Sequence, residues 1–154
     1  MSGMSNEDEQ DGPVIRTAYL VKRLELAVKG HIDIAVRPHG LTATQYTALT
    51  SLRNDPGQSS AQLARRSFVS AQTMQELITS LDRRGLVTRT PSPDNRRVLH
   101  VSLTEDGEAV LAKLDDEVDR IEADMLADLD AGQISALREA LGRCIRRLDT
   151  HPRH

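Results

Sequence analysis

Apolar residues follow a helical period near the start of the 154-residue chain, between about Val14 and Val36. One stripe is formed by Leu20, Leu24, Ala27, His31 and Ile34. A second set beside it consists of Ile15, Tyr19, Leu26 and Val28. A stripe this wide predicts a helix that is buried on more than one side, within the fold or against a partner. Pro38 and Gly40 are expected to end this helix.

The next helix is expected to begin at a capping box formed by Thr42 and Gln45 and to end near Asn54–Gly57. After it, the sequence predicts two helices joined by a tight turn. Ser60 is expected to cap a short helix, Ala61 to Ser67, and Ser70 a longer one that stops at Gly85. The turn between them is Phe68-Val69-Ser70. In the longer helix we predict that one stripe is buried, made of Met74, Leu77, Ile78 and Leu81. The side chains that project away from this stripe are Gln72, Thr73, Gln75, Glu76 and Thr79.

Two runs of strand-like residues follow, Leu86–Thr90 and Val98–Leu103, around the loop Pro91–Arg97. Leu99, Val101 and Leu103 alternate as a half-buried strand should. Two helices, a turn and a β-hairpin in this order predict a winged helix-turn-helix, which places one helix in the major groove of DNA.

Helical spacing returns in the last third of the chain. Thr104 is expected to cap a long acidic helix to about Ala127, and Asp130 with Gln133 to cap a last amphipathic helix. The predicted fold is mainly α with a small two-stranded β wing. Residues 1–12 read as a disordered acidic tail and 13–150 as one domain, with a DNA-binding part at 42–103 and dimerisation helices at 13–36 and 104–150.

Charge is distributed unevenly behind the net value of −3. Residues 1–12 carry −4, residues 13–52 carry +3, residues 53–97 carry +4, and residues 104–149 carry −7. All eight bases of the third stretch are arginine, whose planar fork suits phosphate. A basic middle between acidic ends indicates that one face meets a polyanion, although a solvated charged surface is the simpler alternative. The three aromatic residues are too few for base stacking on single strands or RNA, which favours duplex DNA.

Other functions find little support in the residues. Cys144 is the single cysteine, so no intrachain disulfide can form, and its apolar neighbours predict a packed thiol. We expect no signal peptide, no membrane span and a cytoplasmic protein. The histidines lack zinc spacing, and no nucleophile–base pair, paired acids or glycine-rich phosphate loop is present, so neither a metal, a cofactor nor an enzyme is predicted.

With these residues placed, nearly the whole chain, about Val14 to Leu148, resembles the MarR family of transcriptional regulators. The resemblance is carried by five segments in a specific order and spacing: Leu63-Ala64, Ser70–Met74, Leu81–Val87, Asp94–Arg97 and Val101–Gly107. It implies a homodimeric winged-helix protein that binds a palindromic operator in duplex DNA, usually as a repressor. Family dimers join through their terminal helices, and many release DNA when a small molecule binds.

Two features depart from the family pattern. The family wing commonly reads Asp-x-Arg; Asp94 and Arg96 fit when read forward, and Asn95 and Arg97 fit when counted back from Leu103-Thr104. Either arginine can therefore be the one that enters the minor groove. Glu76 stands where the family commonly has a base, and its carboxylate would repel phosphate unless it accepts from a cytosine amino group or pairs with an arginine.

The residues expected to meet DNA lie on the second helix of the pair and on the wing. They are Ser70, Gln72, Thr73, Gln75, Glu76, Thr79, Arg89, Asp94, Asn95, Arg96 and Arg97. Glutamine suits adenine edges, so Gln72 and Gln75 are favoured as base readers over solvated positions.

Two open questions concern ligands and partners. Tyr19 and His31 could line a pocket for a small amphipathic or aromatic effector, although core packing is favoured for each. The alternative function is a winged-helix module that binds another protein and does not touch DNA.

Overall fold

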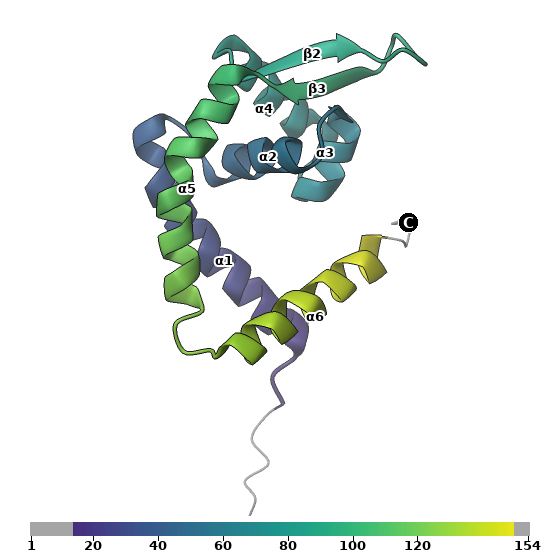
Figure 1. Cartoon of the computed structure of the whole chain (residues 1–154). Coiled ribbons are helices and arrows are strands. Elements are labelled where there is room, and N and C mark those ends of the chain that lie inside the picture. Colours follow the sequence, from purple (N-terminus) through teal and green to yellow (C-terminus); the bar gives the residue numbers. More distant parts are fainter. Residues whose placement is uncertain (1–13, 150–154) are drawn as a thin grey trace, which may run out of the picture.

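The computed structural model describes residues 14–149, which form helices around one small sheet (Figure 1). The predicted tail at 1–12 lies outside the described residues. In chain order the elements are α1 (Thr17–Val36), η1 (Arg37–His39), α2 (Ala43–Asn54), β1 (Gln58–Ser59), α3 (Ser60–Ser67), α4 (Ala71–Arg83), β2 (Val87–Pro91), β3 (Leu99–Leu103), α5 (Glu105–Met125) and α6 (Ala131–Asp149).

Most predicted helix starts are confirmed by their side-chain caps. Thr42 Oγ1 accepts from the Gln45 N–H at 3.2 Å, and Gln45 Oε1 accepts from the Thr42 N–H at 3.0 Å. Asp130 and Gln133 form the same reciprocal pair at α6. The predicted cap of α3 was wrong by one residue: Ser59 is the cap, because Gln62 stands three residues after Ser59 and completes the capping box there.

The sheet has three strands where two were predicted, in the order β1-β3-β2. Gln58 of β1 pairs with Val101 of β3, and its buried side-chain amide donates to the Ser51 and Asp55 carbonyls at 2.9 and 2.8 Å. A strand of two residues is too short to show alternation in the sequence, which is why it was not predicted.

The hydrophobic core lies where α2, α3, α4 and the sheet meet the first half of α5. The predicted stripe of α4 is buried in it: Met74, Leu77, Ile78 and Leu81. These side chains meet Leu49 and Leu52 of α2, Leu63 of α3, and Leu111 and Leu114 of α5 within one cluster. The core therefore fixes α4 on one side and leaves its other side outward. We call α2 to β3 (residues 43–103) the winged-helix body.

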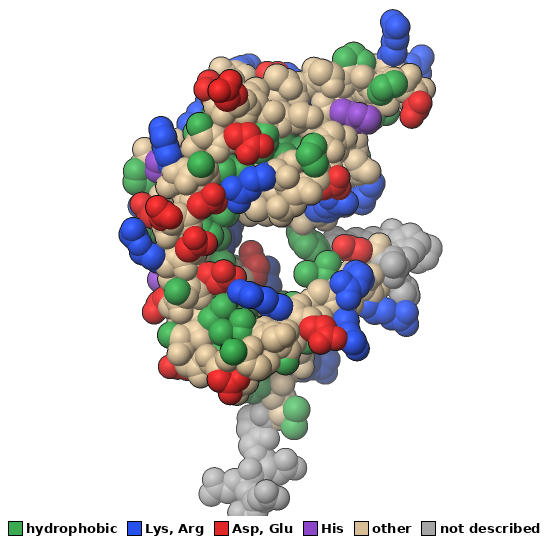
Figure 2. Space-filling view, in the orientation of Figure 1, with side chains coloured by type: hydrophobic (Ala, Val, Ile, Leu, Met, Phe, Trp, Pro, Cys, Tyr) green, Lys and Arg blue, Asp and Glu red, His purple; other side chains and the backbone are tan. Residues whose placement is uncertain are grey.

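Two helices bury little within their own chain. Only Ala35 and Val36 of α1 are buried, and no described residue of α6 is. In Figure 1, α1 and α5 lie together while α6 crosses below the winged-helix body, and the space-filling view shows an opening with hydrophobic side chains facing it (Figure 2). The packed thiol expected at Cys144 is not observed, because Cys144 lies on α6 and is exposed. No helix within residues 14–149 is apolar over a length that could span a bilayer.

Candidate DNA-binding interface

The turn before α4 sets the angle between the two helices of the pair. Phe68 ends α3 in the left-handed conformation at φ 56°, and the Val69 N–H donates to the Ala64 carbonyl at 3.2 Å. Ser70 then caps α4 by accepting from the Thr73 N–H at 3.1 Å. The Ser70 hydroxyl also donates to the Thr73 hydroxyl at 2.9 Å, so both side chains support the start of the helix.

The outward face of α4 carries the predicted base readers. Gln72, Gln75 and Glu76 are exposed, and Thr79 is half-buried with its hydroxyl donating to the Gln75 carbonyl at 2.8 Å. Their spacing of three, four and seven residues places them on one side of the helix. Glu76 makes no salt bridge with any residue from 14 to 149, so its carboxylate is not neutralised by a described arginine.

The wing ends in a tight turn that presents both arginines. The Asn95 carbonyl accepts from the Val98 N–H at 2.9 Å, and the Asn95 side-chain oxygen accepts from the Arg97 N–H at 3.1 Å. Asn95 therefore opens a β-turn whose two corner residues are Arg96 and Arg97, and both are exposed. Asp94, before the turn, is exposed, and its N–H donates to Ser92 Oγ at 3.3 Å. Figure 2 shows basic side chains at this free end of the wing.

Arg89 lies further down the wing and is engaged within the protein. Its Nε and Nη2 donate to Asp82 Oδ2 at 3.0 and 2.8 Å. Asp82 belongs to the last turn of α4, so this pair fixes strand β2 against α4. The Arg89 side chain remains 29% accessible to solvent.

Four of the eight arginines between residues 53 and 97 are engaged within the chain, three of them in ion pairs. Arg53 binds Asp115, Arg66 binds Asp55, Arg89 binds Asp82, and Arg84 donates to backbone carbonyls. The other four arginines form no ion pair with the described residues: Arg65, Arg83, Arg96 and Arg97. The unpaired positive charge is thereby concentrated on α3, on the end of α4 and at the tip of the wing.

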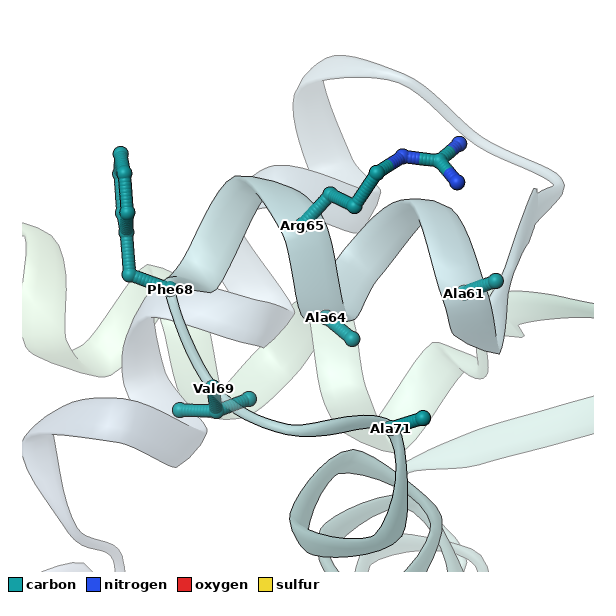
Figure 3. A pocket seen from close by; sticks show the side chains of 6 residues that line it. All are labelled: Ala61, Ala64, Arg65, Phe68, Val69 and Ala71. Carbon is teal, nitrogen blue, oxygen red and sulfur yellow. The ribbon is translucent and has the colours of Figure 1, made fainter. Parts of the chain in front are cut away.

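Arg65 is a site residue that sequence reasoning did not single out. It lies on α3 beside the turn and lines a shallow pocket of about 360 Å³ with Phe68, Val69 and three alanines. In Figure 3 its side chain extends along the surface of α3 rather than into the core. The first helix of a helix-turn-helix crosses the phosphate backbone, so an arginine in this position could have been anticipated from the motif alone.

A second cavity, of about 300 Å³, lies between α1 and α5. It is lined by Leu24, Ala27, Val28, His31, Arg120, Ile121, Asp124 and Met125. The core packing favoured for His31 and Tyr19 was wrong, because both side chains are exposed; His31 lines this cavity, whereas Tyr19 is not among its lining residues and is 57% exposed. Arg120 and Asp124 were not predicted, because only the packing of α5 against α1 brings them to His31.

Comparison with known proteins identifies the family. Residues 39–98 match the model of the MarR family. The HTH-type transcriptional repressor Rv2887 of Mycobacterium tuberculosis is 34% identical over 115 residues, which make up 75% of this chain and 83% of that protein. The chain belongs to the MarR family. As a MarR-family transcriptional regulator it has the winged-helix fold predicted from its sequence.

Solved structures agree with this assignment. The structure of the MarR-family protein Rv2887 from M. tuberculosis with salicylic acid is 30% identical and has a TM-score of 0.70, covering 85% of this chain and 97% of that one. MarR of E. coli, in its apo form, is 21% identical with a TM-score of 0.74, covering 86% and 98% of the two chains. The latter likeness supports the fold alone.

Proposed function

We propose that this MarR-family regulator is a homodimeric repressor that binds a palindromic operator in duplex DNA. The observation that carries the proposal is the arrangement of α4 beside the wing. The buried stripe of α4 holds the helix in the core, its opposite face is polar and exposed, and the adjacent wing ends in two exposed arginines. A polar helix face flanked by cations fits a major groove bordered by phosphates.

Within this interface α4 reads bases. Gln72 and Gln75 carry amides that can donate and accept at once, which matches the adenine edge in the major groove. Glu76 accepts from a cytosine amino group, the role left to a carboxylate that no described arginine neutralises. Thr73 and Thr79 have shorter side chains and make supporting contacts.

The wing and the neighbouring helix hold the phosphate backbone. Arg96 and Arg97 supply charge at the wing tip, with Asp94 and Asn95 shaping the loop that presents them. Arg65 meets the phosphates crossed by α3, and Ser70 offers a hydroxyl at the start of α4. Arg89 positions the wing through Asp82 and turns its remaining donors to the backbone.

The dimer forms through α1 and α6. Both helices carry large apolar side chains that their own chain leaves exposed, among them Tyr19 at 57%, Leu26 at 55% and Ile145 at 58%. A folded chain rarely leaves so many large apolar side chains in water, and a second copy of the same helices would cover them.

The cavity between α1 and α5 suits a small aromatic acid that weakens DNA binding. Its walls are largely aliphatic, His31 and Arg120 can hold a carboxylate, and Asp124 can accept from a hydroxyl or amino group. One relative, Rv2887 of M. tuberculosis, was solved with salicylic acid and with p-aminosalicylic acid. Salicylate should weaken operator binding by about 5-fold to 150-fold, and DNA should weaken salicylate binding by the same factor. Arg120→Gln should abolish this effect, while Lys113→Gln, on the same helix, should preserve it.

Selection of bound sites from random duplex DNA tests the main proposal. The expected result is a palindrome whose half-sites lie about one helical turn apart, with binding that weakens steeply as salt rises. A protein-binding module would enrich no site and show only weak background binding.

A further inference from the structure

Two adjacent arginines end the recognition helix α4, and the second one reaches a distant part of the chain. Arg84 Nη2 donates to the His39 carbonyl at 2.7 Å and Nη1 donates to the Gly40 carbonyl at 2.8 Å. The backbone of Arg84 is itself held as the C-cap of α4, with its N–H directed to the Ser80 and Asp82 carbonyls. The guanidinium therefore projects from a fixed point at the end of the helix.

The two accepting carbonyls belong to the turn that directly continues α1. His39 is the last residue of η1, and Gly40 caps it in the left-handed conformation at φ 70°. Carbonyls at a helix end lack intrahelical donors and carry partial negative charge, so a cation is favoured there. A Cβ on Gly40 would lie 3.4 Å from Arg84 Nη2, so the guanidinium packs directly on this residue. Only the forked arginine side chain can satisfy two neighbouring carbonyls with a fixed geometry.

This contact joins elements that otherwise pack on different neighbours. α4 packs mainly on α3 and β2, whereas α1 packs mainly on α5 and α2. The turn is also held from its other side, since Asp33 Oδ1 on α1 accepts from the Ala43 N–H of α2 at 2.7 Å. Arg84 is therefore a direct hydrogen-bonded link between the recognition helix and the end of α1.

We propose that Arg84 is a positioning residue that fixes the orientation of α4 relative to α1 and thereby sets the separation of the two recognition helices in the dimer. The inference rests on the dimer of the proposed function. In a two-fold dimer joined through α1, any rotation of α4 against α1 occurs in both protomers, so its effect on the separation is doubled. That separation must match half-sites about one helical turn apart.

Spin-label distance measurements between protomers test this role without DNA. Cys144→Ser removes the single cysteine, and Thr88→Cys then places one label on the exposed side of β2. Arg84→Ala should give roughly a doubling of the width of the distance distribution, because the end of α4 loses its hydrogen bonds to the turn after α1 and only the packing of α2 still orients the winged-helix body against α1. Arg83→Ala is the matched control, since it removes the same charge from the adjacent exposed residue and should keep the parent distribution.

The outcomes separate a specific link from a general effect. Arg84→Lys should also broaden the distribution, because lysine keeps the charge without the fork; it carries the test if Arg84→Ala does not fold. An unchanged distribution in the Arg84 variants, or equal broadening in Arg83→Ala, would overturn the inference. If the labelled parent protein shows no measurable spin–spin distance between two protomers, the proposed dimer itself is contradicted.

Discussion

The outward face of α4 places two amides and one carboxylate within five residues, and we expect the amides to affect DNA binding differently from the carboxylate. Because Gln72 and Gln75 are neutral, they can add sequence preference without adding affinity for phosphate. Because Glu76 is negative and no described arginine pairs with it, we expect it to oppose DNA binding wherever the base it faces is not cytosine. On this proposal, specificity on this face arises partly from attraction and partly from repulsion.

Replacing either glutamine should reduce the preference for the cognate DNA sequence and leave the affinity for other duplexes nearly unchanged. Gln72→Ala or Gln75→Ala should weaken binding to the cognate operator by roughly 1–3 kcal/mol per half-site if the amide holds an adenine edge. Binding to a scrambled duplex should hardly change. Titrations on both duplexes at one salt concentration provide the measurement, and equal losses on the two would show that the wrong face of α4 has been assigned to the groove.

Glu76→Gln should shift binding in the opposite direction on non-cognate DNA. The variant keeps the size of the side chain but removes its charge, so affinity for scrambled duplexes should rise while preference at one base pair of each half-site falls. Competition of cognate against scrambled DNA measures both. Glu108→Gln removes the same charge from an exposed position on α5 and should leave the ratio unchanged. A Glu76→Gln protein with unaltered preference would exclude base reading by this carboxylate.

At the scale of elements, local sequence signals defined most of the fold because they act over a few residues. Capping boxes and periodic apolar positions located the helices, and alternation located β3. Strand β1 was not predicted, because its two residues are too few to show an alternating pattern. The pairing of Arg89 with Asp82, and the reach of Arg84 to His39, could not be predicted, because the sequence does not say which arginine meets which acceptor. An amphipathic pattern likewise predicted α6 without revealing that no described residue of this helix is buried against its own chain.

The junction between the sheet and α5 should tolerate no side chain at Gly107. A Cβ there would overlap the Leu86 carbonyl, which itself accepts from the Thr104 N–H at 3.1 Å. Gly107→Ala should therefore destabilise the fold by about 1–3 kcal/mol, because backbone cannot move aside as a flexible side chain can. Chemical denaturation measures this change. Ala109→Ser, exposed on the next part of α5, should stay within about 0.5 kcal/mol of the parent, and similar values for both variants would contradict the account.

In the whole molecule, the exposed apolar side chains of α1 and α6 are expected to be buried against a second copy of the chain. Ultracentrifugation at micromolar concentration should give twice the 17.0 kDa chain mass. Ile145→Glu places a charge on the apolar stripe of α6 and should shift the protein towards monomer or aggregate. Ala136→Glu adds the same charge to the opposite face of α6 and should leave the dimer intact. A parent protein that sediments as a monomer would contradict the dimer.

We propose that α4 reads bases while the wing holds the phosphate backbone, and the salt dependence of DNA binding distinguishes these two roles. Binding of the parent, the double variant Arg96→Ala/Arg97→Ala and the double variant Gln72→Ala/Gln75→Ala should be measured on cognate and scrambled duplexes across a salt series. The arginine variant should bind both duplexes more weakly, with the log–log slope reduced by about 0.9 per lost phosphate contact in each half-site. The glutamine variant should keep the parent slope and lose affinity on the cognate duplex alone. Binding that does not depend on salt, or slopes that are the same in all three proteins, would contradict the account.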